Sequence, residues 1–213
     1  AIFKFFLLLV IVSMMANEYS NKTLKQNLID GLSKREFIFS KFYTVIALAL
    51  ISTFFVFIVS IILGYSYSDF NEFSIVTTDL EYLLAFFIKL VGFFSFGLFM
   101  GILVKRSAFA VGGILVWFFG ESILKGYLFW QFKDVDGTTE RVNSIMQFLP
   151  LESISNLIKE PFTRLSAVKT VAQQVGENLS KDFSVQPTDL LIVTVWTGIF
   201  IYLSYALLKK RDL

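Results

Sequence analysis

Long apolar runs alternate with short polar segments along the whole chain. Five runs are long enough, or nearly so, to cross a bilayer as helices, which takes about 20 residues. They cover residues 2–15, 37–63, 80–104, 108–130 and 190–208. The runs are continuous rather than alternating, which argues against membrane-barrel strands and favours helices. The pattern predicts an all-α, polytopic membrane protein that forms a single transmembrane domain over residues 1–213.

Basic residues fall on alternate connections, and this predicts the orientation. Residues 17–36 hold four Lys or Arg, the 105–106 turn holds two and residues 209–211 hold three, whereas residues 65–79 hold none. Because short cytoplasmic loops are enriched in Lys and Arg, we expect those three places in the cytoplasm. The chain start and residues 65–79 and 131–188 are then outside.

The composition narrows the possible functions. The chain is 55% hydrophobic with a net charge of +2, which indicates a lipid membrane rather than nucleic acid as its partner. It contains no Cys and no His, so thiol catalysis, disulfides and the usual zinc ligands are excluded. No phosphate-binding glycine loop is present either. We therefore expect no catalytic site, no metal and no cofactor bound by this chain.

The segment from Asn17 to Ser40 is the polar, basic connection between the first two runs. In residues 19–32 the apolar positions have helical spacing and form one face, which predicts a short amphipathic helix: Leu24, Leu28, Ile29 and Leu32. Asp30-Gly31 is a helix stop, and Ser33 with Glu36 predicts a capping box that begins the next helix.

This segment has two interpretations. One is an ordinary surface loop between two spans. The other is a cytoplasmic helix gripped by another protein, with five candidate contact residues: Tyr19, Lys22, Leu24, Lys25 and Leu28.

Residues 131–188 predict short amphipathic helices outside the membrane. An apolar stripe over 142–149 is broken by Pro150 and resumes over 154–158, and a third stripe covers 165–175. Such helices either rest on the lipid surface or plug the outer mouth of a pathway.

Three charges lie within or near the expected spans: Lys89, Glu121 and Lys125. Counted from the 105–106 turn, Lys89 and Glu121 reach similar depths on two consecutive helices. We expect those helices to be antiparallel neighbours, so that Lys89 pairs with Glu121 while Lys125 reaches Glu121 or the surface. The pair is interpreted either as a structural lock or as the polar lining of a transport route. Gly97 and Gly101 form a close-packing motif, which favours helix packing within one subunit.

The 17–41 segment resembles the permease subunits of type-2 ABC transporters. In that family a span ends in a cytoplasmic pattern that this chain matches at Glu18, Thr23, Leu28, Gly31, Leu32, Ser33, Lys34 or Arg35, Glu36, Phe37 and Lys41. The chain departs from the pattern at Lys22, where Gly is common, and it lacks the usual Pro after the turn. The basic end at 207–213 and Leu149-Pro150 also look like family features.

The resemblance implies six spans, of which the five runs would be the second to the sixth, so we expect further segments before residue 1. It also implies a coupling helix at 19–32 that docks on a separate ATP-binding cassette subunit. ATP would bind that partner, and a second permease chain would complete a homodimer or heterodimer. The expected location is the cell membrane, which is the inner membrane in bacteria, with the C-terminus in the cytoplasm. A scaffold or assembly protein without transport, or a membrane enzyme, remains an alternative.

Overall fold

The computed structural model describes residues 2–67, 80–133, 137–158 and 184–211, and these residues form helices. In chain order the helices are α1 (Ile2–Ser20), α2 (Thr23–Ile29), α3 (Lys34–Tyr67), α5 (Glu81–Val104), α6 (Ser107–Gln131), α7 (Thr138–Met146), α8 (Pro150–Asn156) and α10 (Pro187–Lys210). The all-α fold class is therefore confirmed.

Four of these helices are long and apolar enough to cross a membrane: α3, α5, α6 and α10. They coincide with the last four predicted runs, and α3 extends the second run at both ends. The first run forms α1, which continues past residue 15 to Ser20. Because α1 is not among those four helices, its membrane crossing stays a prediction.

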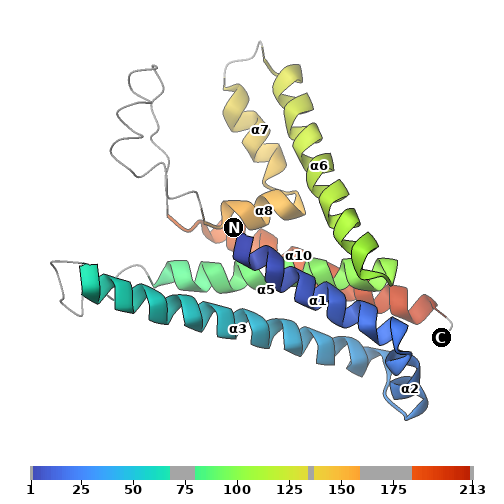
Figure 1. Cartoon of the computed structure of the whole chain (residues 1–213). Helices are drawn as coiled ribbons and strands as arrows, with labels where there is room; N and C mark the ends of the chain where they lie inside the picture. Colours follow the sequence, from blue (N-terminus) through green and yellow to red (C-terminus); the bar gives the residue numbers. More distant parts are fainter. Residues whose placement is uncertain (1, 68–79, 134–136, 159–183, 212–213) are drawn as a thin grey trace.

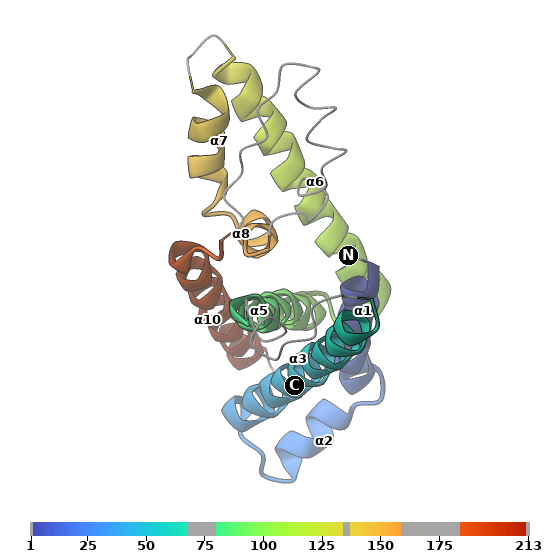
Figure 2. The ribbon, with the colours of Figure 1, turned by 90° about the vertical axis from the view of Figure 1, so that its left-hand side faces the viewer.

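Helix α5 is the centre of the fold. Helices α1, α3 and α10 all pack against it (Figure 1, Figure 2). More than half of its apolar stretch is buried, whereas α3 and α6 expose most of theirs. Phe96 of α5 packs against Phe200 of α10, with ring centroids 5.1 Å apart. An apolar helix buried inside a bundle and surrounded by lipid-facing helices is typical of a membrane protein.

Glycines bring α1 close to α5. A Cβ added at Gly101 would lie 2.9 Å from the Cβ of Met15, and one added at Gly97 would collide with Leu8. The predicted close-packing motif is therefore confirmed as a contact between two helices of one chain.

Helix α6 departs from the expected arrangement. After the 105–106 turn at the end of α5, α6 runs away from α5 at a wide angle (Figure 1). Helix α7 lies alongside α6, and α8 lies between α6 and α5 (Figure 1, Figure 2). The expectation that α5 and α6 lie antiparallel along their lengths was wrong. Helix α8 contacts α5, α6 and α10, so it occupies the space that closely packed antiparallel helices would not have left.

The predicted helices after α6 are present where the structure describes them. Val142 and Met146 of α7 are fully buried, and Pro150 begins α8 at its first position. Their position outside the membrane stays a prediction. The third amphipathic helix, over 165–175, and most of the acidic 65–79 loop lie outside the described residues.

Candidate functional site

The connection between α1 and α3 folds into one short helix with a defined turn at each end. Lys22, before α2, has a left-handed backbone with φ 56°, and Gly31, after α2, has φ 102°. The predicted helix over 19–32 is thus shorter than expected, because α1 continues through Tyr19 to Ser20 and α2 covers only Thr23–Ile29.

Glu18 ties α2 to both neighbouring helices. Thr23 at the start of α2 donates a hydrogen bond to Glu18 Oε2 at 2.6 Å, and Lys41 of α3 forms an ion pair with Glu18 Oε1. Burial opposes ionisation of Glu18, but the hydrogen bonds from Lys41 and Thr23 outweigh it and lower the Glu18 pKa below its ordinary value of 4.5. The carboxylate is therefore charged at neutral pH and joins three helices at one point.

The predicted capping box at the start of α3 is confirmed. The Ser33 amide and hydroxyl both donate to Glu36 Oε2, at 2.8 and 2.7 Å, and the Glu36 amide donates back to Ser33 Oγ at 3.2 Å. These bonds fix the direction in which the chain enters α3.

The five candidate contact residues differ in exposure: some face solvent, and others face the protein itself. Lys22, directly before α2, and Lys25, on α2, are exposed, and Leu28 is half-buried. Leu24 is fully buried, so its role as a partner contact was wrong: its side chain belongs to the protein's own core.

Tyr19 also faces the protein. Its hydroxyl accepts a hydrogen bond from Arg211 at 3.2 Å, and the Lys105 ammonium lies 5.8 Å from its ring centroid. Tyr19 therefore connects α1 to the 105–106 turn and to the C-terminal end.

Arg211 forms hydrogen bonds with the ends of several helices. Its guanidinium donates to the carbonyls of Ile102 and Leu103 at the end of α5, the latter at 2.8 Å. Its own carbonyl accepts a hydrogen bond from Lys34 Nζ at 2.8 Å. The ends of α1, α5 and α10 and the beginning of α3 thus meet around this residue, next to the α2 connection.

A second polar cluster surrounds α8. Glu121 of α6 is only 9% exposed, and its carboxylate accepts hydrogen bonds from the backbone amides of Leu151 and Glu152, at 3.1 and 3.0 Å. Trp117 Nε1 donates to the same carboxylate at 2.7 Å. Glu121 therefore caps the beginning of α8, where a negative charge is stabilised by unpaired amides and the helix dipole.

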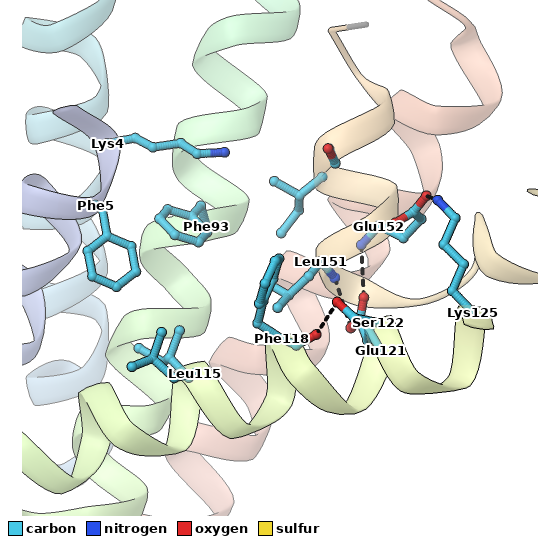
Figure 3. Close-up of a pocket in the computed structure, with 13 residues that line it drawn as sticks. Lys4, Phe5, Phe93, Leu115, Phe118, Glu121, Ser122, Lys125, Leu151 and Glu152 are labelled. Carbon is cyan, nitrogen blue, oxygen red and sulfur yellow. Dashed lines mark hydrogen bonds and ion pairs between the residues drawn. The ribbon is translucent and has the colours of Figure 1, made fainter. Parts of the chain in front are cut away.

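The predicted Lys89–Glu121 pair was wrong. Lys89 Nζ donates to the backbone carbonyls of Ser155 and Ile158, at 3.0 and 3.5 Å, at the other end of α8. Lys125 pairs with Glu152 rather than with Glu121 (Figure 3). The pairing fails because α6 diverges from α5 and α8 lies between the two charges.

A cavity of about 420 Å³ opens between α1, α5, α6 and α8. Figure 3 shows Lys4 extending from α1 past Phe93, with Phe118, Glu121 and Lys125 on the α6 side. Aromatic and aliphatic side chains form most of the wall, together with a few charged groups: Lys4, Glu121, Lys125 and Glu152.

A family model described as "ABC-2 family transporter protein" matches residues 5–213. No curated protein and no solved structure matches the chain. The chain belongs to the ABC-2 transporter family. The match covers nearly the whole sequence, so it applies to the bundle and to both polar clusters.

Membership in the ABC-2 family confirms the resemblance and the multi-pass membrane location. It assigns the chain to the membrane component of a transport system. Glu18 and Lys41, two positions of the family pattern that are far apart in sequence, form an ion pair in the structure.

Three residues of this ABC-2 protein were missed by sequence reasoning. Ile29, which was placed on the apolar face of the predicted helix, is 74% exposed at the end of α2. Arg211 was counted only among the basic residues 209–211, and Lys4 was not singled out. Only the position of each side chain relative to distant helices distinguishes them.

Proposed function

We propose that this chain is the membrane-spanning subunit of an ATP-driven transporter and that α2 couples it to a separate ATP-binding cassette subunit. The chain would form part of the substrate route with a second permease chain, in the cell membrane, with α2 and the C-terminus in the cytoplasm. Family membership supports the transport role, and the Glu18 network supports the coupling role.

The network of Glu18, Thr23 and Lys41 carries this proposal. A helix of seven residues in a flexible loop would not transmit a displacement from a partner to the neighbouring helices. Here the start of α2 is bonded to the end of α1, and that same carboxylate is bonded to α3. The capping box at Ser33 stiffens the other end of the connection. A displacement of α2 would therefore move α1 and α3 together.

The exposed face of α2 suits a protein partner. Lys22 and Lys25 offer positive charge, and Ile29 adds an exposed apolar side chain. A short helix of this kind seats in a groove through its apolar side chain, while the charges set its orientation.

The test is charge reversal on this face in the assembled transporter. Lys22→Glu with Lys25→Glu should leave membrane insertion intact and uncouple ATP hydrolysis by the partner from transport. The matched control is Lys210→Glu, because Lys210 is an exposed lysine outside α2. Unchanged coupling in the double variant would overturn the role of α2. Partner binding with no stimulated ATP turnover in the unaltered chain would favour the scaffold alternative.

A further inference from the structure

Lys4 lines the cavity between α1, α5, α6 and α8 and forms no ion pair with another described residue. Its ammonium lies 5.1 Å from the ring centroid of Phe93, and the described ion pairs are those of Lys41 with Glu18 and of Lys125 with Glu152. The Lys4 ammonium has neither a hydrogen bond nor an ion pair within the described part of the chain, so it is available to contact an anion.

The two carboxylates in the cavity wall have partners of their own. Glu121 accepts two backbone amides and the Trp117 indole, and Glu152 is paired with Lys125. Lys89 does not line the cavity, and its ammonium donates to two backbone carbonyls at the end of α8. Among the charged side chains of the described cavity wall, Lys4 is therefore the one with neither a hydrogen bond nor an ion pair.

The rest of the wall is apolar. Phe5, Phe93 and Phe118 face the cavity, together with aliphatic side chains of α6 and α8: Ile114, Leu115, Leu151 and Ile154. An apolar wall with charge at one place suits a molecule that has a hydrocarbon part and one polar end.

We propose that this cavity binds an amphiphile with a negatively charged headgroup, such as an alkyl phosphate or an anionic phospholipid. The anionic group contacts the Lys4 ammonium, and the hydrocarbon lies along Phe5, Phe93 and Phe118. A lipid of the surrounding bilayer and a transported amphiphile share this chemistry. The binding site stands independently of the coupling proposed for α2, and the role of the amphiphile as a substrate rests on the proposed function.

The first test measures binding by the full chain in detergent or nanodiscs. Trp117, one turn from Glu121, serves as the reporter after Trp130 and Trp196 are replaced by Phe. Brominated phosphatidylglycerol should quench Trp117, and decyl phosphate should reverse the quenching at a concentration roughly tenfold or more below that needed for decyltrimethylammonium. Equal competition by the two detergents would overturn the proposal without any mutation at the site.

The second test assigns the preference to Lys4. Lys4→Gln should remove the preference for decyl phosphate, and Lys4→Arg should keep it, because the guanidinium restores the charge. The control is Lys133→Gln, since Lys133 is exposed and does not line the cavity. A preference that survives Lys4→Gln would overturn the assignment.

ATP hydrolysis by the assembled transporter then separates the two sources of the amphiphile. Stimulation by decyl phosphate that is lost in Lys4→Gln supports a transported amphiphile. Binding with unstimulated hydrolysis supports a resident bilayer lipid and leaves the binding site in place. If hydrolysis is uncoupled from transport in the unaltered chain while binding persists, the proposed function fails and this inference stands.

Discussion

Glu121 and Lys89 hold opposite ends of the same short helix. The Glu121 carboxylate accepts the amides of Leu151 and Glu152 at the beginning of α8, and Lys89 Nζ donates to the carbonyl of Ser155 near its end, at 3.0 Å. A negative charge at the first turn and a positive charge at the last turn both interact favourably with the helix dipole. Helix α8 has seven residues and would be marginal alone, so these two contacts from α6 and α5 stabilise it.

Removing the Glu121 charge should therefore destabilise the region around α8. Glu121→Ala leaves two backbone amides and the Trp117 indole without their acceptor, and we expect a loss of about 2 to 3 kcal/mol. Thermal unfolding in detergent measures it. The control is Glu140→Gln, a change at an exposed position in the first turn of α7. Equal melting temperatures for Glu121→Ala and the control would contradict the capping role.

Local features of this chain were predictable from sequence, and long-range pairings were not. The capping box at Ser33 and the turn at Gly31 depend on neighbouring residues, so a short stretch of sequence contains the whole of each. The Lys89–Glu121 pair depended on the angle between α5 and α6. That angle reflects α8, which lies some 30 residues further along the chain from Glu121.

The exposure of α2 illustrates the same limit. Helical spacing predicts that Leu24, Leu28 and Ile29 lie on one apolar face of a helix. In the structure Leu24 is buried and Ile29 is 74% exposed, because α2 is too short to bury the whole stripe against α1. Which end of such a stripe is buried follows from the left-handed turn at Lys22, a conformation that a lysine does not predict.

Lys22→Gly should stabilise the isolated chain. Lys22 has φ 56° and ψ 17°, a conformation that costs a residue with a Cβ roughly 1 to 2 kcal/mol and costs glycine little. Glycine also makes the unfolded chain more flexible, so the expected net gain is about 1 kcal/mol. Thermal unfolding is again the measurement.

Lys25→Gly is the matched control for Lys22→Gly. It removes the same charge from an exposed position, but inside α2, where glycine costs about 1 kcal/mol relative to a good helix former. The two variants should shift the melting temperature in opposite directions. A decrease in both would show that the left-handed turn does not limit stability.

The Glu18 ion pair should make stability depend on pH in a defined direction. The Glu18 pKa in the folded chain is lower than its ordinary value of 4.5, because the hydrogen bonds from Lys41 and Thr23 outweigh burial. The contribution of this pair is then fully present above about pH 4.5 and is lost as the pH falls through the folded-state pKa. Glu18→Gln should be less stable than the natural chain at pH 7, and this difference should narrow on acidification below pH 4.5.

Lys41→Gln tests the cause of that pH dependence. Without the Lys41 ammonium the Glu18 carboxyl keeps only the bond from Thr23, so its pKa moves upward and the chain should lose less stability on acidification. Melting temperatures between pH 7 and pH 3.5 distinguish the variants. A pH profile of Lys41→Gln that matches the natural chain would assign the acid sensitivity to other carboxyl groups.

The contact between α1 and α5 should be intolerant of a single added methyl group. A Cβ at Gly101 would lie 2.9 Å from the Cβ of Met15 and 3.6 Å from the backbone oxygen of Val12. Neither atom is the end of a flexible side chain, so α1 itself must shift. Gly101→Ala should therefore cost about 1 to 3 kcal/mol. Gly112→Ala, in α6, meets no atom within 4 Å and should be neutral or slightly stabilising, because alanine favours the helix. If the two variants unfold at the same temperature, α1 does not pack against α5 as closely as this structure has it.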